Sequence, residues 1–247
     1  MGSAVLFDRS VEGLLSEIEK TVRLVEQLAC YIPLPVLNLL VESAARRQIP
    51  PDFPTPTVLF VNLIGLPESV DEALPNEEAD LVSSFSKVFA LINAAVEARG
   101  GVLKKVTYHV EGSDIVIYFG VPVGHTDDPM RAAEAALAIR DVIAGLKPPT
   151  VGGHRVVVTC QMGLARGAAF AAEIGEPRGR REFNVLGDTV NTAARLMGKA
   201  VKNQIYMTES VYQQVKNRFD CEVLEPISLK GKAAPTPVFS LRGVLTA

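Results

Sequence analysis

The chain has 247 residues, with 25 Lys and Arg against 28 Asp and Glu, and 48% of its residues are hydrophobic. A disordered chain would carry fewer apolar residues and a less balanced charge, and a dedicated nucleic-acid binder would usually be basic, so both classes are excluded. Three cysteines cannot form a closed disulfide framework, and no apolar run reaches the roughly 18 residues that a membrane span needs. We therefore expect a globular, cytoplasmic protein with neither a membrane span nor a nucleic-acid partner.

Residues 1–55 predict a helical segment that ends in a proline-rich linker, IPPDFPTPT. Its first helix has an N-cap candidate in Ser10 and an apolar seam with spacings of four and three residues. The seam consists of Val11, Leu15, Ile18, Val22 and Val25. Such a helix either packs on its own domain or pairs with a second copy, and the spacing leaves both interpretations open. A second, shorter helix is expected from about Pro35 to Arg47.

Residues 56–247 predict one larger domain in which strands and helices alternate. Helices are expected over 77–98, 128–146, about 190–200 and 209–218, and strands over 57–65, 101–120 (two strands with Gly112 in the turn), 155–167, 184–187, 205–210 and 237–243. The strands are short and rich in β-branched residues, whereas the helices repeat apolar residues every three to four positions. This alternation indicates one mixed sheet with helices packed against it.

A series of glycine-containing motifs gives the domain a family resemblance. The segment GRREFNVLGDTVNTAARL matches the pattern R-x-Y-x-V-x-G-x-x-V-N-x-A-x-R-L, and FVNLIG, the Gly100–Gly101 pair, the strand that ends in YFG, MGLARGAAFAAEIG and SLKGKAAPTPVFSL follow their counterparts in order. The chain from about Thr57 to Gly243 resembles the class III adenylyl and guanylyl cyclase catalytic domains. The resemblance implies an α+β, ferredoxin-like βαββαβ fold with additional strands, here with an N-terminal helical extension. It also implies head-to-tail dimers, whose active sites lie across the interface and convert ATP to cyclic AMP and pyrophosphate.

Two metal-binding aspartates of the family have no counterpart here. The first falls on Asn62 and the second, counted from the YFG strand, on Ser113. Hard divalent cations prefer carboxylate oxygens, so the resemblance implies no metal site in this chain. Asp114 is adjacent, but side chains alternate along a strand, and we expect it on the face opposite the site. It is either a solvated carboxylate or a displaced ligand. The three histidines are not spaced as metal ligands and receive no role.

The remaining site residues have counterparts. Asn191 and Arg195 lie four apart on a predicted helix, where they share one face, and they match the family's transition-state pair. Lys105 matches the adenine-reading lysine if the register is counted from Gly101, with Lys104 as a rival. Asn184 takes the second purine-reading position, and Lys230 is the candidate for the pyrophosphate, with Lys232 close behind.

The degenerate aspartates also resemble the metal-free second half of two-domain soluble adenylyl cyclases, in which FVNL likewise replaces F-x-D-I. This implies a chain that supplies the purine-binding and transition-state half of a composite site. Mg²⁺ or Mn²⁺ would enter only with a metal-bearing partner. The implied assembly is a head-to-tail homodimer or a heterodimer with a metal-bearing cyclase domain, and a homodimer would be catalytic only if substituted ligands held the metals. The alternative is a catalytically inactive module that binds ATP or another purine nucleotide and regulates signalling. Catalytic activity is therefore left open.

Overall fold

The computed structural model describes residues 10–44, 48–109, 112–147, 149–176 and 179–245, which fall into two compact units that meet between Gln48 and Ile49. The first unit contains α1 (Val11–Ala29) and α2 (Leu34–Glu42). Ser10 caps α1, since its Oγ accepts a hydrogen bond from the Gly13 amide at 3.0 Å. The second helix ends at Glu42, earlier than expected, and the expected end at Arg47 lies outside the described residues.

The apolar seam of α1 is exposed along its whole length. None of the nineteen residues of α1 is buried, and the five seam residues are between 50% and 74% exposed. The helix is amphipathic as the spacing predicts.

The proline-rich segment belongs with the second unit. The amide of Asp52 donates to the carbonyl of Ala171 at 2.8 Å, and the amide of Ala171 donates back at 2.9 Å. The boundary between the units therefore comes before this segment, earlier than the 55/56 position that composition indicates.

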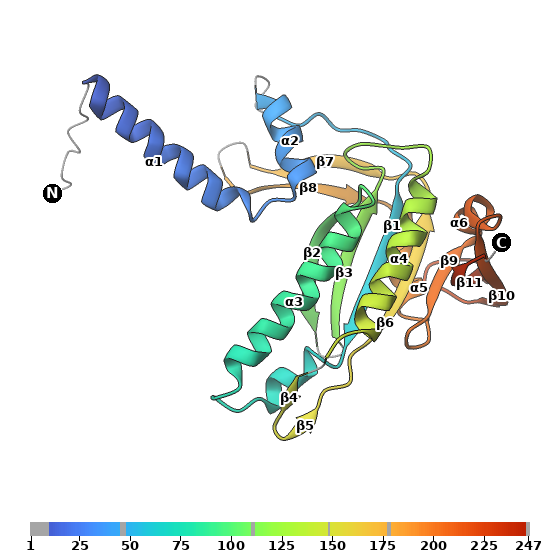
Figure 1. Ribbon diagram of the computed structural model, residues 1–247. Coiled ribbons are helices and arrows are strands. Elements are labelled where there is room, and N and C mark those ends of the chain that lie inside the picture. Colours follow the sequence, from blue (N-terminus) through green and yellow to red (C-terminus); the bar gives the residue numbers. More distant parts are fainter. Residues whose placement is uncertain (1–9, 45–47, 110–111, 148, 177–178, 246–247) are drawn as a thin grey trace. The chain divides into compact units, whose positions relative to one another are not determined.

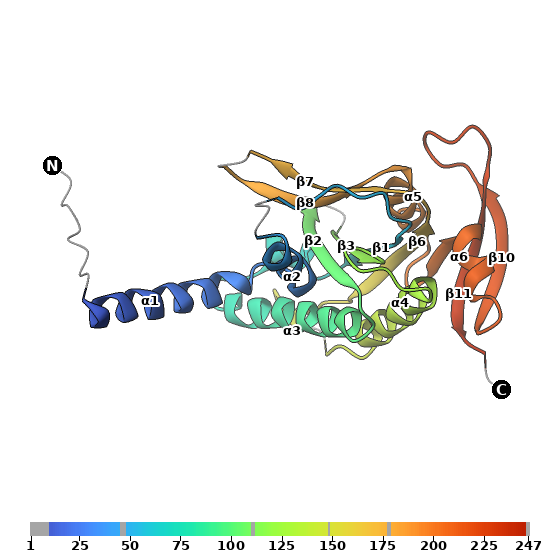
Figure 2. The same ribbon diagram turned by 90° about the horizontal axis from the view of Figure 1, so that it is seen from above.

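The second unit is built on a seven-stranded sheet in the order β10-β11-β9-β6-β1-β3-β2 (Figures 1 and 2). Its core elements are β1 (Thr57–Ile64), α3 (Glu78–Glu97), β2 (Val102–His109), β3 (Gly112–Phe119), α4 (Asp128–Ala144) and β6 (Thr159–Arg166). The strands β1, β2, β3 and β6 lie in the order β6-β1-β3-β2, and each pair of neighbours within this set is antiparallel. The order and directions are those of the ferredoxin-like βαββαβ fold, which confirms the expected fold class.

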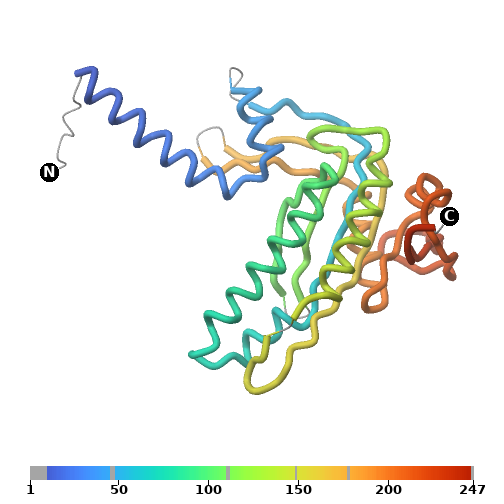
Figure 3. The backbone as a smooth tube through the Cα atoms, in the orientation of Figure 1, coloured from blue at the N-terminus to red at the C-terminus, as the bar shows by residue number. Residues whose placement is uncertain are grey.

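Additional strands extend the sheet beyond β6. The first of them, β9 (Ile205–Thr208), runs parallel to β6. The chain then passes through α6 (Glu209–Val215) into β10 (Phe219–Ile227) and β11 (Thr236–Val244), drawn in orange to red in Figure 3. Two short hairpins complete the domain: β4 (Thr150–Val151) with β5 (His154–Arg155), and β7 (Phe170–Gly175) with β8 (Arg181–Leu186). Among the strands longer than two residues, the sequence pattern does not predict β7 and β10.

The two faces of the sheet are covered differently (Figure 2). On one face α3 and α4 pack on Leu59, Val61 and Leu63 of β1. On the other face α5 (Asp188–Met197) and the β7–β8 hairpin pack on Val58 and Phe60. Because side chains alternate along β1, Asn62 falls on the face that carries α5.

One helix among the described residues, α3, is long and apolar enough to cross a membrane by length and composition. It directs Leu81, Val88, Ile92 and Val96 into the core that it shares with α4 and the sheet. Its apolar side is thus used in packing the domain.

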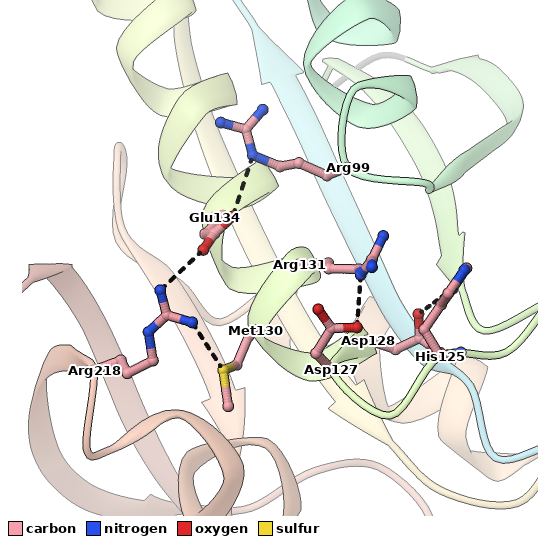
Figure 4. A network of polar contacts seen from close by, with 8 residues as sticks. All are labelled: Arg99, His125, Asp127, Asp128, Met130, Arg131, Glu134 and Arg218. Atoms are coloured by element: carbon pink, nitrogen blue, oxygen red, sulfur yellow. Dashed lines mark hydrogen bonds and ion pairs between the residues drawn. The ribbon is translucent and has the colours of Figure 1, made fainter.

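Polar contacts fix the ends of α3 and α4 (Figure 4). Glu134 lies between the guanidinium groups of Arg99 and Arg218, each at 3.9 Å. At the start of α4 the buried carboxylate of Asp128 accepts a hydrogen bond from the His125 amide at 2.8 Å. These contacts hold the loop after β3, and the segment before β10, against the helical layer.

Gly163 of β6 permits the close approach of α5 to the sheet. A Cβ at this position would lie 2.2 Å from the carbonyl oxygen of Ala193 and 2.4 Å from the amide nitrogen of Met197. We expect Gly163→Ala to displace α5 and to lower the free energy of unfolding by about 2–4 kcal/mol in urea denaturation. The matched control is Gly243→Ala, where a Cβ would meet nothing within 4 Å. Equal stability of the two variants would contradict the packing described.

Candidate functional site

The first group of candidate residues lies on α5. Gly187, whose φ of 148° favours glycine, turns the chain from β8 into this helix. Asn191 and Arg195 follow on one face, as their spacing predicts; Asn191 is exposed, and the Arg195 side chain is 31% exposed. Both are accessible to an anion.

A loop between β10 and β11 completes this group. Gly231 lies against the Arg195 guanidinium, since a Cβ on it would be 3.5 Å from Nη1. Lys232 forms a short ion pair with Asp188, in the first turn of α5, and the Arg195 Nη1 lies 4.0 Å from the same carboxylate. Lys230 is exposed in the same loop. Of the two lysine candidates, Lys232 is the one that the described contacts bring to Arg195.

Asp188 is an acidic member of this basic group that the sequence analysis did not single out. The hydrogen bond from Lys232 is the main cause that holds the pKa of Asp188 below its ordinary value, and burial partly opposes it. Thr192 contributes a further hydrogen bond from Oγ1 at 3.4 Å. The carboxylate therefore stays ionised beside Lys232 and Arg195 at neutral pH.

A second group joins β2 to β8. The β2–β3 register shifts between Leu103 and Lys105, so Lys104 is the extra residue of a β-bulge. Burial lowers the pKa of Lys104, and the nearby carboxylate of Glu182 partly opposes this. Glu182 in turn accepts a hydrogen bond from Asn184 Nδ2 at 3.5 Å. Lys104 is thus half-buried and within electrostatic range of Glu182, whereas Lys105 is exposed.

Glu182 is also a residue that the sequence analysis missed. It lies two residues before Asn184 and so on the same side of β8, which is the signal that could have identified it. Arg180 forms a short ion pair with Glu182, and Arg181 Nη1 lies 2.5 Å from Glu173.

The third group surrounds Asn62, the first expected metal position. Asn62 is buried, and its Nδ2 donates to Gln161 Oε1 at 3.4 Å. The Gln161 Nε2 donates to the carbonyl of Ala200, just after α5, at 2.5 Å. Gly112 approaches the Asn62 side chain so closely that a Cβ on it would be 2.2 Å from Oδ1.

The strand register corrects the expected position of Asp114. Asn62 of β1 is paired with Asp114 of β3, and Leu63 is paired with Ser113. Alternation does place Ser113 and Asp114 on opposite faces, but Asp114 is the one that shares the face of Asn62, because paired residues point to the same side. Ser113 is buried on the face of α3 and α4. His109, to which no role was given, lies with its Nε2 3.1 Å from Asp114 Oδ1.

These residues do not fit the two-metal site of the resemblance. Asn62 offers a neutral amide, and the one carboxylate beside it contacts His109. Within the described ranges, no group of three or more His, Cys, Asp or Glu residues could hold a metal ion. A hard cation would find one carboxylate where two are needed.

Comparisons with known proteins agree with the fold and the motifs. The model of the adenylate and guanylate cyclase catalytic domain matches residues 51–242. An adenylate cyclase of Mycobacterium tuberculosis (strain ATCC 25618 / H37Rv) is 31% identical over 203 residues, which are 79% of this chain and 43% of the relative. Human guanylate cyclase soluble subunit beta-2 is 24% identical over 221 residues, which are 88% of this chain and 33% of the relative. The chain spans less than half the length of these curated relatives.

Solved structures show the same fold at lower identity. The adenylyl cyclase CyaB from P. aeruginosa has a TM-score of 0.67 at 19% identity, and the matched region covers 78% of this chain and 96% of the CyaB chain. A bacterial light-regulated adenylyl cyclase has a TM-score of 0.72 at 18% identity, and the matched region covers 96% of this chain and 65% of the cyclase chain. Because the family model spans most of the residues and the fold agrees with it, the chain belongs to the adenylate and guanylate cyclase catalytic domain family.

Proposed function

We propose that this chain supplies the purine-binding and transition-state half of a composite nucleotidyl cyclase site. One observation carries the proposal: Asn191, Arg195 and Lys232 gather on one side of α5, while an amide stands at the first metal position. The chain therefore has cations for phosphates but only one of the two carboxylates that the metals need. The divalent cations that the reaction needs would be held by a partner domain in a head-to-tail dimer.

The retained residues have defined tasks in this proposal. Arg195 offers a planar fork of N–H donors to the oxygens of the reacting phosphate, and Asn191, one helical turn earlier, orients the ribose or a phosphate oxygen. Lys232, with Lys230 beside it, faces the pyrophosphate. Lys104 and Asn184, with Glu182 between them, face the purine edge, where amide and ammonium groups donate and the carboxylate accepts.

Relatives support the choice of ligand and assembly. Their structures include a guanylate cyclase domain in complex with GTP and a guanylyl cyclase domain described as a non-canonical dimer.

The three cysteines are free thiols, which supports the cytoplasmic location that is part of the same proposal.

Titration of the isolated chain with ATP and GTP, combined with product analysis, tests this function. We expect a purine nucleoside triphosphate to bind, Arg195→Ala to weaken binding by about tenfold or more, and the wild-type chain alone to release no cyclic nucleotide. Cyclic product from the wild-type chain, or no binding of either nucleotide, would contradict the proposal.

A regulatory module without catalysis is the second candidate function. The exposed apolar seam of α1 favours it, because a helix with such a stripe can pair with a second helix and transmit a signal. The two candidates differ in one result: a regulatory module yields no product even when a metal-bearing domain completes the site.

Lys104 and Lys105 give a prediction about the base-binding half. We expect Lys104→Ala to weaken nucleotide binding by about tenfold, because Lys104 lies in the bulge beside Glu182 and Asn184. Lys105→Ala, the matched control on the next residue, should change binding by about twofold or less. Calorimetry on both variants measures this, and the reverse order would restore Lys105 as the base-reading residue.

A further inference from the structure

The phosphate-facing cations of α5 and the 230–232 loop already have a carboxylate between them. Asp188 forms a short ion pair with Lys232, and its Oδ1 lies 4.0 Å from Arg195 Nη1. Its side chain is 64% exposed, against 32% for Lys232 and 31% for Arg195. The carboxylate is thus the most exposed of the three groups, and solvent can reach it.

A polyphosphate can compete with this carboxylate. Ion pairs at the protein surface contribute little to stability, so Asp188 can be displaced at low cost. A pyrophosphate group carries more negative charge than one carboxylate and offers several oxygens, which suits the guanidinium fork of Arg195 and the ammonium of Lys232 together.

The backbone around the cations is fixed, so that only side chains need to move. The Lys232 amide donates to the Leu229 carbonyl at 3.0 Å, and Leu229 is buried in a core cluster with Leu196 of α5. Gly231 adopts a left-handed φ of 79° against Arg195. We therefore expect rotation of the Asp188 and Lys232 side chains, without movement of the backbone, to present both cations to a phosphate.

We propose that Asp188 is a displaceable counter-anion of the phosphate subsite: it pairs with Lys232 and Arg195, and a pyrophosphate or triphosphate group takes its place. The inference rests on the proposed function and adds a regulatory element to the same site. Asp188 lowers the affinity for phosphates and keeps the two cations in position until a polyanion binds.

The test is calorimetric titration of the full chain with inorganic pyrophosphate at fixed ionic strength. Asp188→Asn removes the charge but keeps a side chain of the same shape, and we expect it to tighten pyrophosphate binding by about three- to tenfold. Glu222→Gln is the matched control, because this substitution changes the net charge by the same amount. Glu222 of β10 forms an ion pair with Arg242 of β11. The control substitution should leave the affinity unchanged. Thermal melting of each variant checks that the domain is folded.

The outcomes separate this inference from the proposed function. If Arg195→Ala and Lys232→Ala weaken binding while Asp188→Asn leaves it unchanged or weakens it, the counter-anion role is overturned and the phosphate subsite stands. If Glu222→Gln tightens binding as much as Asp188→Asn, the effect is one of net charge and the inference also fails. If no variant binds pyrophosphate, both the inference and the proposed function are wrong.

Discussion

Asn62→Asp is expected to give this chain a metal-dependent stability and a metal-dependent cyclase activity, whereas the proposed half-site predicts neither for the wild type. The substituted residue would face Asp114, its register partner across β1 and β3, and paired residues on one face have Cβ atoms about 4.5–5.5 Å apart. Two carboxylates at that separation suit a divalent cation with oxygen ligands. In a head-to-tail homodimer, Asn191 and Arg195 of the second copy would supply the other half of the site.

The metal-free variant should be less stable than the wild type. Position 62 is buried, and its amide donates to Gln161 Oε1, an interaction that a carboxylate cannot make. Mn²⁺ binding should more than offset this, since a ligand at a hundred times its Kd stabilises the folded state by about 2.7 kcal/mol. Thermal melting with and without Mn²⁺, followed by product analysis with ATP and GTP, measures both effects.

Ser113→Asp is the matched control for this prediction. It restores the carboxylate at the position obtained by counting from the YFG strand, but the register places Ser113 opposite Leu63 on the face of α3 and α4. A carboxylate buried there should destabilise the domain and give no Mn²⁺ response. If Ser113→Asp responds to Mn²⁺ and Asn62→Asp does not, the assignment of Asp114 to the site face is wrong.

Arg195→Ala should abolish most of the activity that Asn62→Asp creates. Removing one preorganised donor to a reacting oxyanion typically costs 10²–10³ in rate, and we expect a loss of at least about 100-fold in kcat. The control is Arg218→Ala, whose side chain is 63% exposed and pairs with Glu134 on the helical layer. It should change kcat by about twofold or less.

Loss of folding would not explain such a result. The Arg195 side chain is partly exposed, so Arg195→Ala should change the free energy of unfolding by about 0.5 kcal/mol or less in urea denaturation. An unchanged kcat in the Arg195→Ala variant would remove Arg195 from the transition state and with it the proposed half-site.

The fold could be predicted because ordered glycine motifs and buried strands mark it in the chain. The two missed strands lack such marks. Most of β10 faces solvent and shows no clean alternation, and β7 consists of the weakly β-forming sequence FAAEIG, which pairs with β8 outside the main sheet. Strand preference is decided by neighbours in the sheet, which sequence periodicity does not contain.

The candidate site was predictable where one helix or loop carries it and not where strand register decides. Helical spacing predicts that Asn191 and Arg195 share one face, and the family resemblance assigns them to the site. The choice between Lys104 and Lys105 depends on a bulge, and the choice between Ser113 and Asp114 depends on which residue faces Asn62 across β1 and β3. A shift of one residue moves every side chain of a strand to the opposite face. Counting from a distant glycine therefore could not decide either of these two choices.

The composite nature of the site is tested most directly by complementation between two forms of this chain. One is the double variant Asn62→Asp/Arg195→Ala, which would hold metal but lacks the arginine. The other is the wild type, which has the arginine but has an amide in place of the metal carboxylate at position 62. The account predicts Mn²⁺-dependent cyclic nucleotide in the equimolar mixture and none from either chain alone. Product from the double variant alone at the rate of the mixture would place the whole site in one chain, and no product in a mixture that does form dimers would contradict the half-site role.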